Sequence, residues 1–350
     1  MSETRKLRIG ILQDSSYASV YIRDLITWAQ LQDDLEVSHL IVYATPGETK
    51  VAGWRRKWSH LKLKGFRVAV LRGIRLLEQA VLRRYYGGKH RDHLRQFPVG
   101  QQVPNVVHIQ PTISKSGLVY RFSAEEVAKV RSLDCDVLIR GGVGILRGDI
   151  LTASRFGILS FHHGDNRVNR GGPAGFWESY YGWPATGFII QRLTSELDGG
   201  DVLVRGSYAT KWFFLFNQAS LLSNSNPHLM ALLKRVARER ALPSAEEPLP
   251  YSGTLFRTPS VLVCIAYLVR VADRLLRKLG HGLFRYRERW SVSFTRGDWR
   301  QAAFWRATQV KTPARRFLAD PFVWEHGGRT FCLVEDYVYR EHRAGISAFE

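Results

Sequence analysis

Cysteine is scarce in this sequence and shows no metal-binding spacing. Cys135, Cys264 and Cys332 are the three cysteines among 350 residues, and they lie far apart. Three distant cysteines argue against a disulfide framework and favour a reducing compartment, so we expect a cytoplasmic protein. The lack of any CxxC pair also argues against a cysteine-based zinc site.

Long apolar runs are missing as well. The N-terminal residues lack the apolar core of a signal peptide and lead directly into a strand-like segment. The most apolar helical run, residues 261–271, is too short to cross a bilayer and is followed by charged residues. The sequence therefore predicts neither a signal peptide nor a membrane-spanning helix.

Acidic residues are few beside the basic ones. The chain has 31 Asp and Glu against 51 Lys and Arg, which gives a formal net charge of +20. Residues 50–95 hold 14 Lys and Arg with only Glu78 and Asp92 as acids, and they include Trp54-Arg55-Arg56-Lys57-Trp58. Such a segment predicts contact with a polyanion, a membrane surface or a phosphorylated substrate, and fits a solvated helical insertion equally well. No nucleic-acid-binding motif accompanies it.

Short apolar runs alternate with helical patterns through much of the chain. Several of these runs are apolar along their whole length, as strands buried on both faces of a sheet are. The alternation predicts an α/β fold with a doubly wound, mostly parallel sheet, whose ligands bind at the carboxyl ends of its strands. Strands are expected at residues 7–12, 37–43, 106–109, 135–139, 158–161, 186–193 and 202–207.

Three regions are expected along the chain. Residues 1–215 would form the α/β domain, with a basic helical insertion at 50–97. Residues 216–290 would form a helical and linker region, in which Asn226-Pro227 is a helix start signal. Residues 291–350 turn to Trp, Phe, Thr and Gly, which predicts the start of a β-rich domain that is cut short.

The stretch from residue 157 to 201 concentrates the candidate site. An apolar strand ends on His162 and His163, and a loop rich in Gly, Asp, Asn and Arg follows. A histidine there can take a proton from an attacking amine, and Asp198 on a later turn can orient its imidazole. Taken one at a time, a core histidine and a turn aspartate are the more common roles of such residues.

The order of several short motifs within this stretch is more specific. Ser160-Phe161-His162 is followed by Arg170-Gly171, Thr186-Gly187 and Leu197-Asp198-Gly199-Gly200. This order resembles the catalytic domain of the 10-formyltetrahydrofolate-dependent formyltransferases, which act on glycinamide ribonucleotide, methionyl-tRNA and sugar amines. The resemblance covers roughly residues 7–241 and is sharp over 135–201.

The resemblance implies a Rossmann-like fold, 10-formyltetrahydrofolate as co-substrate, and formyl transfer to an amine. His162 would stabilise the oxyanion or move the proton, and Asp198 would position His162. The family's asparagine falls on Ser160 here, and Asn166 is the loop residue that could replace it. The acceptor would be an amino sugar in a nucleotide- or lipid-linked precursor, with its phosphates on the basic insertion. The residues implied to hold the pterin are Gly142, Val143, Gly144, Ile145, Leu146, Gly164, Asp165 and Asp198.

Two departures from the family pattern keep other functions open. One is Ser160, and the other is the charged Gly164-Asp165-Asn166-Arg167 loop, which stands where the family has an apolar one. A metal-dependent hydrolase could use the cluster of His162, His163, Asp165 and Asp198. A non-catalytic scaffold that binds carbohydrate or polyanions is the third hypothesis.

The C-terminal segment carries a resemblance of its own. Ala319-Asp320-Pro321-Phe322 is similar to the first blade of the five-bladed propellers of glycosidase-like proteins. This resemblance implies a link to carbohydrate and a propeller of which only the first part is present.

Overall fold

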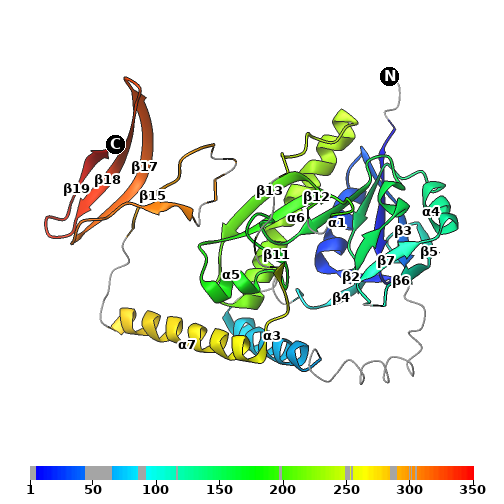
Figure 1. Ribbon diagram of the computed structural model, residues 1–350, viewed down its shortest axis with the longest axis horizontal. Helices are drawn as coiled ribbons and strands as arrows, with labels where there is room; N and C mark the ends of the chain where they lie inside the picture. Colours follow the sequence, from blue (N-terminus) through cyan, green and yellow to red (C-terminus); the bar gives the residue numbers. More distant parts are fainter. Residues whose placement is uncertain are drawn as a thin grey trace. The chain divides into compact units, whose positions relative to one another are not determined.

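The chain divides into two compact units, residues 1–268 and 269–350 (Figure 1). The computed structural model describes residues 5–43, 65–85, 92–115, 117–196, 199–248, 253, 255–283, 290–298, 300, 302–303 and 306–350. The Trp54–Trp58 segment of the basic insertion and Asp198 lie outside these residues.

A seven-stranded sheet forms the centre of the first unit. Its order is β13-β12-β10-β8-β1-β3-β5, and neighbours from β5 to β10 run parallel, whereas β12 and β13 are antiparallel. The predicted fold class, α/β with a doubly wound and mostly parallel sheet, is confirmed. The strands are β1 (Leu7–Gln13), β3 (Leu35–Tyr43), β5 (Asn105–Ile109), β8 (Val137–Arg140), β10 (Ile158–His162), β12 (Ala185–Arg192) and β13 (Asp201–Ala209).

Both faces of this sheet are covered because its central strands are apolar on both sides. Alternate residues of β1, such as Ile9 and Ile11, join one core cluster with the helices α1 (Val20–Gln30) and α6 (Phe214–Glu239). Leu12 and Leu138 face the other cluster, where α4 (Ala124–Arg131) and the 3-10 helix η3 (Asp149–Thr152) pack. Period-two alternation places successive side chains on opposite faces and thus builds two cores from one strand.

Smaller elements surround the central sheet. The basic insertion contributes the helix α3 (Phe66–Tyr85), which agrees with the helical periodicity of its sequence. The short helix α5 (Phe176–Tyr181) is the aromatic run that follows the histidines. Short paired strands complete the unit: β2 (Tyr17–Ser19), β4 (Gln96–Pro98), β6 (Pro111–Ile113), β7 (Val119–Phe122), β9 (Ile145–Arg147), β11 (Arg170–Gly171) and β14 (Leu255–Phe256).

The helix α7 (Val261–Leu283) crosses the division between the units. In the second unit, β17 (Arg316–His326), β18 (Arg329–Val338) and β19 (Arg343–Phe349) form an antiparallel sheet, and β15 (Ser293–Phe294) pairs with β16 (Thr308–Gln309). The propeller and the domain boundaries at 215 and 290 stay predictions. Within the described part of the chain, no helix has both the length and the apolar content required to traverse a bilayer.

Candidate functional site

Ser160 and His162 lie at the carboxyl end of β10, on the same face of the strand. The parallel register pairs Ile158 with Leu138 and Leu159 with Ile139, so Arg140 at the end of β8 comes opposite Ser160. The Arg140 guanidinium lies 3.4 Å from the Ser160 hydroxyl, which itself donates to the Phe161 carbonyl at 3.2 Å. The short hydroxyl at position 160 thus lies beside a cation.

The imidazole of His162 is buried and fixed on one side. Its Nε2 lies 2.8 Å from the Asn169 carbonyl oxygen. Because a carbonyl only accepts, Nε2 carries the proton in this contact, and Nδ1 is the basic nitrogen of the neutral ring. The Asn169 amide in turn donates to Glu178 Oε1 at 2.9 Å.

Glu178 belongs to α5 and is 2% exposed. Burial raises the pKa of its carboxyl, and the hydrogen bonds from Asn169 and the backbone only partly offset this. Glu178 is therefore a buried acid connected to His162 through the side chain and the backbone carbonyl of Asn169.

His163 is distinct from His162 in position and chemistry. Its ring stacks on Phe161 with the centroids 4.9 Å apart, on the face of β10 opposite to His162. Burial, together with the neighbouring His162 and His93, lowers the pKa of His163 to about 3. His163 is therefore neutral at physiological pH and packs as an aromatic ring.

The loop after His163 is held by arginines. Asp165 accepts hydrogen bonds from Arg167 and, at 2.5 Å, from Arg205 of β13, which also donates to the Asn166 amide oxygen at 3.0 Å. Burial opposes ionisation of Asp165, but these two arginines outweigh it and hold the pKa of the carboxyl below its usual value. The side chains of Asp165 and Asn166, both predicted as site residues, thus hold the loop in place through Arg205.

Two glycines allow this loop to lie close to the sheet. A Cβ at Gly164 would come 2.8 Å from His162 Nε2 and 3.0 Å from the Asn169 carbonyl oxygen. A Cβ at Gly187 of β12 would come 2.7 Å from that of Asp165. Real Cβ atoms do not approach so closely, so both positions need glycine for the loop to reach the histidine.

The glycine-rich turn after β8 lies at the same edge. The Tyr43 hydroxyl donates to the Val143 carbonyl at 2.7 Å, and the Arg140 guanidinium donates to the Gly144 carbonyl. Gly144 has a φ of +88°, and a side chain there would strike the Tyr120 ring. Of the residues predicted to hold a pterin, Val143 is 59% exposed, whereas Leu146 is buried in the core.

Several buried polar atoms at this edge have no hydrogen-bond partner among the described residues. They are Gln13 Oε1 at the end of β1, Arg140 Nε, Asn169 Oδ1 and Glu178 Oε2. Buried polar groups in proteins are nearly always paired, and exceptions often mark a place for water or a ligand. The carboxyl ends of β1, β8 and β10 thus offer both donors and acceptors.

Asp198 lies outside the described residues. Of its described neighbours, Glu196 accepts a hydrogen bond from Arg170 of β11 at 3.1 Å, and the Gly200 amide donates to Gln191 Oε1 of β12 in the central sheet at 3.0 Å. Gln191 is the register partner of Ser160. The role of Asp198 stays a prediction.

No three His, Cys, Asp or Glu side chains come close enough to hold a metal ion within the part of the chain that the structure describes. His162 faces the Asn169 carbonyl, His163 lies on the opposite side of the strand, and Asp165 is bound by two arginines. The described members of the predicted metal cluster are therefore kept apart.

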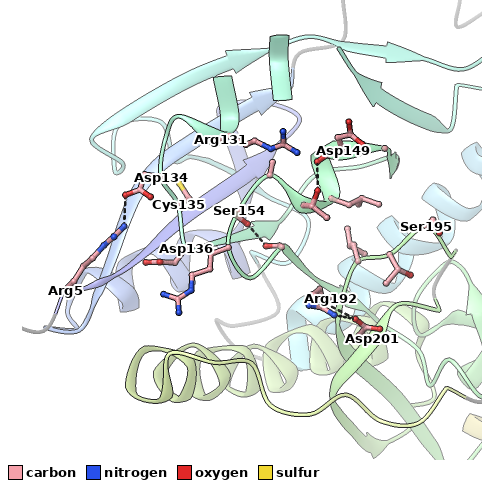
Figure 2. A pocket seen from close by; sticks show the side chains of 18 residues that line it. Arg5, Arg131, Asp134, Cys135, Asp136, Asp149, Ser154, Arg192, Ser195 and Asp201 are labelled. Carbon is pink, nitrogen blue, oxygen red and sulfur yellow. Dashed lines mark hydrogen bonds and ion pairs between the residues drawn. The ribbon is translucent and has the colours of Figure 1, made fainter. Parts of the chain in front are cut away.

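A cavity of ≈ 890 Å³ opens elsewhere, at the amino-terminal edge of the sheet (Figure 2). Its lining includes Asp136 before β8, Arg192 and Asp201 of the antiparallel strands, and Ser195. Neither His162, Ser160 nor Arg140 lines it. The cavity is thus separate from these three residues of the candidate site.

Three residues of this site are not among those predicted from the sequence: Arg140, Asn169 and Glu178. Arg140 was visible as a lone cation at the end of an apolar strand. Glu178 was visible as a single carboxylate within the aromatic run Phe176-Trp177-Glu178-Ser179-Tyr180-Tyr181. Nothing in the sequence marked Asn169, because its carbonyl, and not its side chain, binds His162.

No family model and no curated protein matches the chain. Solved structures resemble it at 9–18% identity. They include a glycinamide ribonucleotide transformylase from Symbiobacterium toebii (14% identity, 68% of this chain and 91% of that one, TM-score 0.44). Another is a sugar N-formyltransferase from a Shewanella species (13% identity, 76% of this chain and 87% of that one, TM-score 0.38). A third is the formyltransferase PseJ from Anoxybacillus kamchatkensis (18% identity, 47% of this chain and 79% of that one, TM-score 0.32). Similarity at these values assigns no function to this chain.

Proposed function

We propose that the chain transfers a formyl group from 10-formyltetrahydrofolate to an amine in the cytoplasm. The acceptor we propose is an amino sugar in a nucleotide- or lipid-linked precursor. The observation that carries this proposal is the arrangement at the ends of β8 and β10, where His162 is fixed by the Asn169 carbonyl and Arg140 lies at Ser160. The order of motifs from Ser160 to Asp198 supports the same reaction.

The carboxyl edge of the sheet fits a pterin chemically. A pterin has a polar edge of donors and acceptors and two flat faces. Gln13 Oε1 and Arg140 Nε are a buried acceptor and donor without partners among the described residues, on adjacent strands. The exposed Val143 and the half-buried Ile145 offer apolar surface beside them.

The residues have separate tasks in this reaction. 10-Formyltetrahydrofolate would supply the formyl carbon, which the acceptor nitrogen takes as the bond to N10 breaks. His162 would accept the amine proton at Nδ1 and return it to N10, while the Asn169 carbonyl holds its Nε2 proton. Arg140 would donate to the formyl oxygen as that atom gains negative charge, in place of the family's asparagine. Asp198 would orient His162.

The test separates binding from turnover. Calorimetric titration with a stable 10-formyltetrahydrofolate analogue would be made on the wild type, on His162→Ala and on His108→Ala, which alters an exposed histidine of β5. We expect all three to bind the analogue, and only His162→Ala to lose formyl transfer to nucleotide-linked amino sugars. Absence of binding, or full turnover by His162→Ala, would overturn the proposal. Binding with no turnover toward any amine would favour the scaffold hypothesis.

A further inference from the structure

Helix α7 exposes an apolar stripe along its length. Ile265, Val269, Leu276, Leu279 and Leu283 are 53%, 62%, 68%, 64% and 82% exposed. They follow one another at intervals of three, four or seven residues, so they share one side of the helix. An exposed apolar surface of this kind marks a contact with a partner or a membrane.

The other sides of α7 differ in character. Cys264, Tyr267 and Val271 form a buried side and are 0%, 0% and 8% exposed. The polar side is almost entirely cationic, because Asp273 is the one acid in the helix sequence. Its cations are Arg270, Arg274, Arg277 and Lys278. An apolar stripe combined with a side rich in Lys and Arg is typical of helices that lie in the surface of a bilayer.

The start of α7 is firmly attached to the first unit. The buried Tyr267 hydroxyl donates to Glu78 of α3, and it also accepts the Phe214 amide of α6 at 2.7 Å. Glu78 accepts the Leu215 amide at 2.6 Å, so one carboxylate joins three helices. Binding of α7 to a membrane would therefore also tether the first unit, to which the start of the helix is hydrogen-bonded.

Helix α3, which meets α7 at this junction, exposes apolar residues too. Phe66, Leu77 and Val81 are 59%, 56% and 43% exposed, whereas Leu71 and Ile74 on its inner side are buried. Arg72 lies among the exposed residues. The same combination of apolar and cationic surface therefore occurs on two helices that are joined by a buried hydrogen bond.

We propose that α7 docks the protein on a bilayer surface that contains anionic lipids, with its apolar stripe in the interface and its Arg and Lys side chains at the headgroups. The +20 charge of the chain is complementary to such a surface. The same charge argues against a second copy of the chain as the partner of the stripe, because pairing two copies would bring like charges together. This docking surface is independent of the formyl-transfer reaction.

The experiment is co-flotation of the purified full chain with vesicles of phosphatidylcholine alone or mixed with phosphatidylglycerol. We expect binding to the mixed vesicles only, and weaker binding as salt is raised. Leu276→Glu and Leu279→Glu should each reduce the partition coefficient at least about tenfold, since burying one leucine side chain is worth that much. Arg270→Glu with Lys278→Glu should also weaken binding to the mixed vesicles.

Leu31→Glu is the matched control, because Leu31 is 78% exposed at the end of α1, on another helix. It should bind vesicles like the wild type, and unchanged circular dichroism of all variants would show that folding is intact. Equal vesicle binding by Leu276→Glu and the wild type would overturn the proposal. So would a wild-type dimer that binds no vesicles and becomes monomeric in Leu276→Glu, because the stripe would then belong to a second copy.

Discussion

Arg140 is the residue whose charge would matter most if the chain transfers formyl groups. Its guanidinium lies 3.4 Å from Ser160, at the strand position where the formyltransferases that the sequence resembles have an asparagine. Removing one preorganised donor to a developing oxyanion lowers the rate by about 100- to 1000-fold. We therefore expect Arg140→Ala to lower kcat by that factor.

Steady-state kinetics would test this, with Arg131→Ala as control because Arg131 is an exposed arginine of α4. The control should retain the wild-type kcat. An Arg140→Ala protein with wild-type kcat would mean that Arg140 only holds the Gly144 carbonyl in place.

Glu178 predicts a pH dependence of stability. Burial raises the pKa of its carboxyl in the folded state, so the folded protein binds this proton more tightly than the unfolded chain does. Its contribution to stability is therefore most favourable below the ordinary pKa of about 4.3 and is lost as pH rises through the folded value. Glu178→Gln cannot ionise and still offers Asn169 an acceptor oxygen.

We expect the thermal midpoint of Glu178→Gln to fall less than that of the wild type between about pH 4 and pH 8. Differential scanning calorimetry across this range is the measurement. Parallel curves for the two proteins would show that the Glu178 carboxyl keeps its ordinary pKa in the folded protein, contrary to its burial.

The residue contacts were the least predictable part of the site. The sequence places His162 and Arg140 at the ends of apolar strands, but their strands are brought together by the parallel register. The link from Glu178 to His162 runs through a backbone carbonyl, which every residue type possesses. Local pattern can identify polar residues at strand ends, whereas their pairing is decided by contacts distant in sequence.

The loop from Gly164 to Asn169 is the element on which the histidine geometry depends. A methyl group at Gly164 would meet His162 Nε2 at 2.8 Å and the Asn169 carbonyl oxygen at 3.0 Å. One of the two must then move, and their hydrogen bond of 2.8 Å would be lost. We expect Gly164→Ala to lower formyl transfer at least about tenfold, as misplacement of a catalytic group does, and to cost about 1–3 kcal/mol of stability.

Gly345→Ala is the control for this substitution, because nothing lies within 4 Å of a Cβ there. Activity and thermal midpoint of both variants would be measured. If Gly164→Ala keeps the wild-type rate, the Asn169 contact does not position His162 for the reaction.

Strands that are buried on both faces of the sheet could be predicted from the sequence, because burial makes them apolar along their length. Continuous apolar runs identified β1, β3 and β8, and alternation with helices gave the sheet class. Pro227 shows where local signals fail: Asn226-Pro227 was expected to start a helix, yet it lies inside α6. Leu221, Leu229, Leu232 and Leu233 of α6 are buried in the core, and this packing outweighs the cost of about 3 kcal/mol for an interior proline.

At the scale of the whole molecule, the two units differ in how much apolar surface they bury. Among its described residues, the first unit has two core clusters, one on each face of its sheet. In the second unit, the core cluster formed by described residues has only Val292, Leu318 and Val334 fully buried. Its sheet leaves Phe322, Val323 and Ile346 64%, 63% and 80% exposed. Stability follows buried apolar area, so the second unit should be the weaker one.

We therefore expect the amides of β17, β18 and β19 to exchange with solvent at least about tenfold faster than those of β1, β3 and β8, because they open with a lower free energy. Hydrogen exchange followed by mass spectrometry would measure both sets in one molecule. Calorimetry should show two transitions, with the second unit melting first. A single transition with equal protection in both units would show that the second unit gains stability from contacts beyond its own small core.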